Sequence, residues 1–299
     1  MNNIQSTFSI KDLENLTGIK AHTIRIWEKR YNLLEPERTD TNIRTYDLTN
    51  FQKLLNVSYL NKNGYKISKI ATIPSENIPG LVQELAEKDR TNSHIHNTFK
   101  MAMVNFDQHL FYETYKELEK EKSFKEIFYQ NLIPLLEDIG LLWQTGTITA
   151  AHEHFITSLV RQKIVLHTER AQVHQSHATD RTYVLFLPEN EVHELGLMFV
   201  NQQLVEAGCH CIFLGQSVPM DNLEDLLSYY DDIVFISYFT VKPEKDDISN
   251  YLKDFKKSVL INDKIELWLL GRMVGEIKKS KLPKSIKTFD SIDALVKNI

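Results

Sequence analysis

Residues 179–299 alternate between apolar runs and segments with the periodicity of amphipathic helices, and this alternation constrains the fold more than any other feature. Nearly continuous apolar runs are typical of a parallel sheet that is covered by helices on both faces. The five expected strands are residues 183–187, 209–214, 233–238, 266–270 and 286–289. The repeated strand–helix order predicts a flavodoxin-like (Rossmann-like), doubly wound domain over residues 179–299.

The loop after the first strand holds Glu191, His193 and Gly196 in the spacing Glu-x-His-x-x-Gly. Open α/β sheets bind ligands at the carboxyl ends of their strands, where this loop is expected to lie. Since no Gly-x-Gly-x-x-Gly follows the strand, a dinucleotide site is not indicated. A neutral imidazole is a good metal ligand, and a nearby carboxylate, Glu191 or Glu194, can fix its tautomer.

The first 73 residues carry a helical pattern with a basic face. Helices are expected at residues 10–16 and 21–31, and the tight connection between them contains Gly18, as a helix-turn-helix often does. In the second helix, Ile24 and Trp27 share the face that we expect to be buried. The side chains left outward include Thr23, Arg25 and Lys29.

A turn-rich segment with a β-like end follows these helices and is succeeded by a helix pair. This order resembles the DNA-binding domain of MerR-type transcription regulators. The matching residues are Thr17-Gly18, Thr23 to Tyr31, Leu34-Glu35-Pro36, Arg38-Thr39, Arg44-Thr45-Tyr46 and Lys62-Asn63-Gly64-Tyr65. The resemblance implies a winged helix-turn-helix over residues 1–73 that binds double-stranded DNA. The DNA contacts it implies are Thr23, Arg25 and Lys29 on the recognition helix and Arg38, Arg44 and Tyr46 around the wing.

The charge distribution agrees with a DNA-binding head. Residues 1–70 hold 11 Lys and Arg against 7 Asp and Glu, a net charge of +4, while the whole chain carries −5. The remaining 229 residues therefore carry −9. A basic head on an acidic body suits a DNA-binding module joined to a domain that stays off DNA.

Residues 74–80 are rich in Pro, Ser and Gly and predict a linker. Residues 81–178 are expected to be helical throughout, with long helices at 94–120, 124–143 and 149–173. The short connections predict an antiparallel four-helix bundle. Trp143 ends one of these helices and Glu153-His154 begins the next, so the turn around Gly146 is expected to bring them together.

The whole arrangement resembles the cobalamin-dependent, light-sensing MerR repressors of the CarH and LitR type. The resemblance implies that adenosylcobalamin or methylcobalamin binds, that His193 ligates cobalt from below, and that the bundle covers the upper face. The cofactor-binding residues it implies are Trp143, Glu153, His154, Glu191, His193, Gly196, Ser237 and Gly271. Gly196 would let the backbone approach the corrin ring or its tail closely.

Three residues depart from the family pattern. Phe239 stands two positions after Ser237, where a smaller residue is usual, and Arg272 replaces the second glycine of a Gly-Gly pair. An arginine there either obstructs the nucleotide tail or reaches its phosphate, and the sequence leaves both open. Gln144 stands where light-sensing members carry a histidine that takes cobalt after illumination. We therefore expect illumination to change the bound cofactor without producing a stable bis-histidine adduct.

These features predict a cytoplasmic, non-enzymatic regulator, a repressor whose oligomeric state and operator binding depend on cobalamin. Only two cysteines are present, and no apolar run approaches the ~20 residues that span a bilayer. A homo-oligomer, a dimer or tetramer, is expected because one weakly charged head needs multivalency. The alternatives are a regulator with a degenerate pocket that acts without cobalamin, and a corrinoid carrier for a methyltransferase.

Overall fold

The computed structural model describes residues 7–39, 41–89, 92–144, 147–172, 181–277 and 282–299. The chain divides into two compact units, residues 1–160 and 161–299, and each is considered by itself. Within the described ranges, no helix has the length and apolarity needed to cross a membrane.

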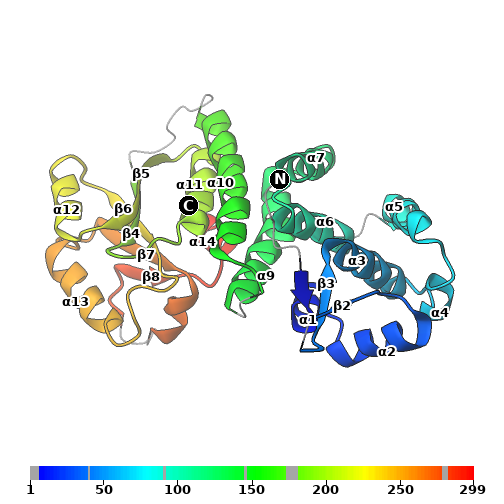
Figure 1. Ribbon diagram of the computed structural model, residues 1–299. Helices are drawn as coiled ribbons and strands as arrows, with labels where there is room; N and C mark the ends of the chain where they lie inside the picture. The colour runs from blue at the N-terminus through cyan, green and yellow to red at the C-terminus, as the bar shows by residue number, and fades with distance from the viewer. Residues whose placement is uncertain (1–6, 40, 90–91, 145–146, 173–180, 278–281) are drawn as a thin grey trace. The chain divides into compact units, whose positions relative to one another are not determined.

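The N-terminal residues form the expected winged helix-turn-helix (Figure 1). The side chain of Ser9 accepts the backbone N–H of Asp12, whose carboxylate accepts the backbone N–H of Ser9, so the first helix starts with a capping box. It stops at Gly18, whose φ of 74° is easy only for glycine. The wing is an antiparallel sheet of order β1-β3-β2. The elements are β1 (Thr7–Ser9), α1 (Ile10–Thr17), α2 (Ala21–Tyr31), β2 (Glu37–Arg38), β3 (Arg44–Asp47), α3 (Leu48–Lys62) and α4 (Ile67–Ile70).

The segment predicted as a linker, residues 74–80, is helical in the structure. It forms the 3-10 helix η1 (Ser75–Asn77) and the start of α5 (Ile78–Asp89). Ile78 is 2% exposed and packs with Val82 against the α3 side chains of one apolar cluster. Apolar contacts of α5 therefore hold this segment against the DNA-binding head, while the domain boundaries themselves remain a prediction.

The helix expected at 94–120 is wrong in one respect, because the structure breaks it into α6 (Asn92–Val104) and α7 (Gln108–Glu119). The break falls at Phe106, whose φ of 51° is left-handed. The carboxylate of Asp107 then caps α7 by accepting the Leu110 N–H at 2.9 Å. Aspartate favours helix starts because its side chain replaces a missing backbone acceptor, and this local signal overrides the apolar stripe that runs through the break.

The rest of the helical region follows the expected order. Residues 124–144 run without interruption from one helix type to the next, and the following helix crosses from the first unit into the second. Buried apolar side chains fill the core of the part within residues 92–160, among them Phe99, Met103, Phe111, Leu135 and Ile156. The elements are α8 (Phe124–Ile127), the π-helical η2 (Phe128–Leu132), α9 (Ile133–Gln144) and α10 (Ala150–Gln172).

The second unit contains the predicted parallel sheet, with strand order β5-β4-β6-β7-β8. This is the flavodoxin-like order, in which the first strand of the domain lies between the second and the third. In Figure 1, α11 and α14 lie on one face of the sheet and α12 and α13 on the other. The elements are β4 (Thr182–Pro188), α11 (Leu195–Glu206), β5 (His210–Val218), α12 (Asp221–Glu224), η3 (Asp225–Ser228), β6 (Ile233–Tyr238), α13 (Ile248–Ser258), β7 (Ile265–Leu270), η4 (Arg272–Glu276), β8 (Ile286–Thr288) and α14 (Ile292–Val296).

Candidate functional site

The loop that carries His193 lies where the strand order of the sheet reverses. β4 is hydrogen-bonded to β5 on one side and to β6 on the other. The chain therefore leaves the carboxyl ends of β4 and β6 in different directions, which opens a crevice for ligands in folds of this kind. The predicted position of the motif at this edge of the sheet is confirmed.

Glu191 ties the two loops of this edge together. Its carboxylate is 1% exposed, and Oε2 accepts the backbone N–H groups of Val241 and Lys242 at 2.6 and 2.8 Å. Oε1 accepts the backbone N–H groups of Val192 and His193 at 2.9 and 3.0 Å. One buried side chain thus fixes both the β4–α11 loop and the β6–α13 loop.

The same carboxylate sets the tautomer of His193. Glu191 Oε1 lies 2.6 Å from His193 Nδ1, and the imidazole is 56% exposed. An ionised carboxylate only accepts hydrogen bonds, so Nδ1 carries the proton, and the neutral form of the ring has its lone pair on Nε2. A histidine oriented by a carboxylate in this way has the chemistry of a metal ligand.

Backbone donors keep Glu191 ionised. Burial raises the pKa of this carboxyl, but the hydrogen bonds from the Lys242, Val241 and His193 backbones and from the His193 ring outweigh burial and lower it. The carboxylate therefore stays charged and remains an acceptor for the imidazole at neutral pH.

Glu194, the other carboxylate considered for this task, has a different partner. It is 7% exposed and forms an ion pair with Arg161, which lies in the part of α10 that belongs to the second unit. Glu191, rather than Glu194, therefore orients His193.

Gly196 is needed for a contact within the protein. The side chain of Tyr238, the last residue of β6, lies against it: a Cβ on Gly196 would stand 2.9–3.2 Å from three atoms of the Tyr238 ring. A larger residue at this position would require the ring to shift away from the first turn of α11. The sequence suggested an approach by the cofactor at this position, and the structure places a protein aromatic ring there.

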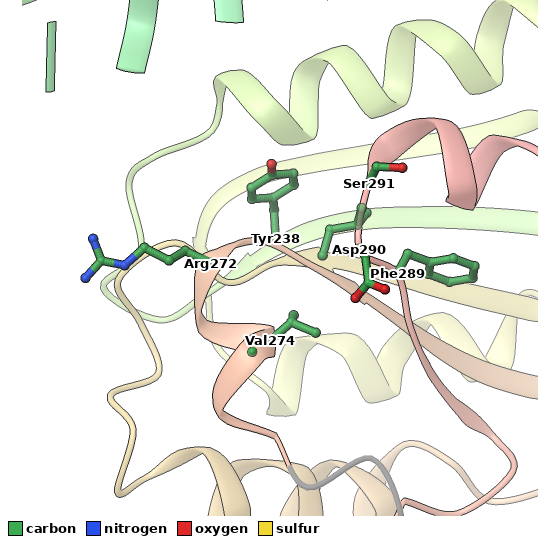
Figure 2. A pocket seen from close by; sticks show the side chains of 9 residues that line it. Tyr238, Arg272, Val274, Phe289, Asp290 and Ser291 are labelled. Atoms are coloured by element: carbon green, nitrogen blue, oxygen red, sulfur yellow. The ribbon is translucent and has the colours of Figure 1, made fainter. Parts of the chain in front are cut away.

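A cavity of about 290 Å³ opens beside Tyr238 at the carboxyl ends of β6, β7 and β8 (Figure 2). Gly271 lines it with a φ of 101°, and a Cβ there would collide with the backbone of Phe239. Arg272 is exposed, and Figure 2 shows its side chain directed away from the cavity. Arg272 therefore does not obstruct the cavity. The lining residues are Tyr238, Leu270, Gly271, Arg272, Val274, Gly275, Phe289, Asp290 and Ser291.

Ser237 and Phe239 flank Tyr238 and are both completely buried. The hydroxyl oxygen of Ser237 has no hydrogen-bond partner within the described part of the chain. Unsatisfied buried hydroxyls are uncommon in folded proteins, so this oxygen is a candidate for a ligand contact. Phe239 belongs to the apolar cluster of the sheet, which explains how this large side chain is tolerated.

The residues expected to contact the upper face of the cofactor, Trp143, Glu153 and His154, lie in the first unit. Two of them form a pair. His154 Nδ1 is 2.5 Å from Glu153 Oε2, and Trp143 is 57% exposed at the end of α9. The neighbouring His152 is buried and stacks on Phe106 with ring centroids 4.6 Å apart. The side chain of Gln144 and all of Gly146 lie outside the described residues.

Some of the predicted DNA-binding side chains are exposed, and others contact residues within the protein. Arg25, Lys29 and Arg38 are exposed, and Thr23 is half-buried. Arg38 donates from its Nη1 atom to the side-chain oxygen of Asn42 at 2.7 Å, which places it beside the turn of the wing.

Glu28 of α2 joins the recognition helix to the wing, and sequence reasoning did not assign it this role. Its carboxylate accepts from Arg44 Nε at 2.9 Å and from the Tyr46 hydroxyl at 3.1 Å. Tyr46 is fully buried, so the expectation that it contacts DNA is corrected: its side chain has no surface to offer. Burial raises the pKa of Tyr46, and the Glu28 carboxylate raises it further. Glu28, Arg44 and Tyr46 can all be read from the sequence, but only the folded wing brings the three side chains into contact.

Comparison with known proteins agrees with both halves of this description. A model of the MerR HTH family regulatory proteins matches residues 8–76, and a model of the B12 binding domain matches residues 95–166. The monomethylamine corrinoid protein of Methanosarcina barkeri has a similar fold, with a TM-score of 0.57 and 14% identity over 70% of this chain and 98% of that one.

Two curated relatives are transcriptional repressors. The chain is 30% identical over 255 residues to the HTH-type transcriptional repressor CarH of Myxococcus xanthus, covering 81% of this chain and 82% of that protein. It is 25% identical over 255 residues to the repressor CarA of the same organism, covering 83% and 82%. The cofactor that these likenesses and the geometry of His193 indicate is cobalamin. With its winged head and its B12-binding domain, the chain belongs to the CarH family of MerR-type transcriptional repressors.

Proposed function

We propose that this chain is a cytoplasmic repressor whose oligomeric state and operator binding depend on cobalamin held by His193. The observation that carries the proposal is the hydrogen bond between Glu191 and His193 Nδ1, which leaves Nε2 as a ligand atom at the crevice of the sheet. His193 Nε2 would hold the cobalt ion that the cofactor would supply when bound. Glu191 orients the imidazole and holds a proton on Nδ1.

The cavity beside Tyr238 supports the binding of a corrinoid whose own base has been displaced. It lies within the same unit as His193, and Tyr238 contacts Gly196, one helical turn after the histidine. We propose that Gly271 and Ser237 also face the cofactor, and that Trp143, Glu153 and His154 contact its upper ligand. The exposed residues Trp143 and His154 support a binding surface on the helical region.

The head supplies the DNA contacts in this proposal. Arg25 and Lys29 extend from α2 and would contact base edges. Arg38 lies beside the turn of the wing and would contact phosphates. One head with a net charge of +4 binds weakly, and a homo-oligomer supplies the affinity through several half-sites.

The experiment is a titration of the purified protein with adenosylcobalamin and methylcobalamin in the dark, followed by the visible spectrum. We expect base-off, histidine-ligated spectra for the native chain, and at least about a hundredfold weaker binding for His193→Ala because the ligand atom is gone. His109→Ala, which removes an exposed histidine of α7, is the control and should bind as the native chain does.

The two alternatives predict other results. A degenerate pocket predicts no spectral change and DNA binding that ignores cobalamin. A corrinoid carrier predicts cobalamin binding by a protein with equal affinity for promoter and random DNA at physiological salt. A cobalamin-dependent shift of both the sedimentation coefficient and the operator affinity would exclude both alternatives.

A further inference from the structure

We propose that the upper face of the cofactor is coupled to the DNA-binding head within one chain, through a contact between Thr147 and Asn15 of α1. The coupling rests on the proposed function, in which Trp143 and Glu153 contact the upper ligand of cobalamin. These four residues all lie in residues 1–160, which form one compact unit.

A side-chain hydrogen bond joins the head to the helical region. Asn15 donates from Nδ2 to the hydroxyl oxygen of Thr147 at 2.8 Å, across 132 residues of sequence. Thr147 is buried and Asn15 is half-buried, so water competes little for this bond. Tyr59 of α3 and His94 of α6 add a ring contact between the same two parts, with centroids 5.5 Å apart. The two contacts hold the head in one orientation on the helical region.

Thr147 is also tied to the helix that carries Trp143. Its backbone N–H donates to the carbonyl of Leu142 at 2.9 Å, and Leu142 directly precedes Trp143 in α9. Leu142 is buried in the apolar core, whereas Trp143 is exposed. A ligand that packs on Trp143 therefore acts on a residue whose neighbour is bonded to Thr147.

The start of α10 is tied to the same segment. The backbone N–H of Thr149 donates to His152 Nδ1 at 3.3 Å, and the Thr149 hydroxyl oxygen lies 2.9 Å from the same nitrogen. His152 is buried and directly precedes Glu153. Residues 147–149 therefore connect the neighbours of both proposed upper-face contacts to the head.

A change at Asn15 reaches the recognition helix through the next residue of α1. Glu14 accepts the backbone N–H of Ala21, the first residue of α2, at 3.2 Å. Arg25 and Lys29 of α2 are exposed, so the contact at Asn15 leaves the DNA-binding side of the head free. The coupling therefore orients the head and does not block it.

The size of the upper ligand determines the direction of the effect. A bulky adenosyl group that packs on Trp143 and Glu153 restricts residues 147–149, and an ordered acceptor strengthens the bond from Asn15. A head that is already oriented loses less freedom when it binds DNA, so its operator affinity rises. Cyanide offers almost no surface to these side chains. Adenosylcobalamin and cyanocobalamin therefore separate the coupling from the binding of cobalt.

Amide hydrogen exchange of the full chain in the dark, read by mass spectrometry, measures the response of α1. We expect adenosylcobalamin to slow exchange in α1 about threefold to tenfold, as one hydrogen bond allows, and cyanocobalamin to change it less than about twofold. Asn15→Ala and Thr147→Val each remove the bond, so this response should be lost. Their affinity for adenosylcobalamin should fall by no more than the same factor, because coupling is reciprocal.

Operator affinity gives the functional readout. The ratio of operator affinity with adenosylcobalamin to that with cyanocobalamin should fall about threefold to tenfold in either variant. The double variant should lose no more than each single variant, because both changes remove one bond. Sedimentation velocity at matched concentrations should give both variants the assembly state of the native chain.

Two control variants remove side-chain hydrogen bonds that do not join the head to the helical region. Asn61→Ala removes an amide that donates to the Tyr65 carbonyl within the head. Thr168→Val removes a hydroxyl that donates to the Ile164 carbonyl within α10. Both variants should keep the native exchange response of α1 and the native ratio of operator affinities.

Two results would overturn the coupling. If exchange in α1 slows in Asn15→Ala as it does in the native chain, the protection takes another route. If the ratio of operator affinities falls only together with a loss of assembly, the contact acts through the oligomer. A native chain with no spectral change on adding either cobalamin contradicts the proposed function, and the coupling with it. Cobalamin-dependent operator binding with no response in α1 contradicts the coupling alone.

Discussion

The head and the flavodoxin-like domain each use one carboxylate to hold a functional loop, but the partners differ in kind. Glu28 accepts from two side chains of β3, the Arg44 guanidinium and the Tyr46 hydroxyl. Glu191 accepts from four backbone N–H groups and one imidazole. Glu28 is 14% exposed at its side chain, whereas Glu191 is 1% exposed.

The difference shows what each carboxylate does for its neighbours. Glu28 neutralises part of the charge of Arg44. This ion pair weakens the attraction of Arg44 for DNA, but it fixes the position of the wing. Backbone donors stabilise the charge of Glu191, which can then accept from the His193 ring. The first arrangement positions a surface, and the second prepares a ligand atom.

The largest expected effect is the loss of cobalamin affinity when Glu191 is replaced. Glu191→Gln keeps the shape of the side chain but removes the charge that orients His193, and we expect cobalamin affinity to fall about 10- to 100-fold. Absorbance titration in the dark measures this. Glu189→Gln, an exposed carboxylate of the same loop, should leave the affinity unchanged. If both variants behave alike, Glu191 does not orient the ligand.

The corresponding change in the head is expected to be smaller. Glu28→Gln loosens the wing, and operator affinity should fall about tenfold because a half-buried, charge-assisted contact is lost. Glu37→Gln removes an exposed carboxylate of β2 and should strengthen DNA binding slightly. Electrophoretic mobility shifts compare the two. Stronger binding by both variants would mean that Glu28 acts only through its charge.

Acid should weaken the arrangement around Glu191. The folded-state pKa of Glu191 is lowered, so its contribution to stability is present above the ordinary value of 4.5 and is lost as the pH falls through the folded value. Thermal unfolding from pH 7 to pH 3 should show this loss for the native chain, and Glu191→Gln should flatten it. An identical pH profile for the variant would contradict the assignment.

The smallest expected effect is that of Tyr46→Phe. Loss of one hydroxyl that bonds Glu28 should lower the free energy of unfolding by about 1 kcal/mol. Operator affinity should stay within about twofold of the native value because the ring is buried and its packing is kept. Chemical denaturation and mobility shifts measure the two quantities. A large loss of affinity with unchanged stability would restore Tyr46 as a DNA contact.

Local pattern was sufficient for most of the secondary structure. β6 was expected at 233–238 and α2 at 21–31, and both have those bounds in the structure. Apolar period and caps are properties of neighbouring residues, so they can be seen in one sequence. The break at Phe106 was missed because the apolar stripe continues across it, although Asp107 carried a usable helix-start signal.

The sequence by itself determined the winged head, the helical region, the parallel sheet and the loop that carries His193. Only the tertiary structure decided which side chains meet. It selected Glu191 over Glu194 as the partner of His193, joined Glu28 to Tyr46, and laid Tyr238 on Gly196. Glu28 and Tyr46 lie on different elements, as do Tyr238 and Gly196, and Glu191 is held by the backbone of the β6–α13 loop. These contacts depend on strand order and on the approach of helix to sheet. No local periodicity encodes that geometry, because it arises only when the elements pack.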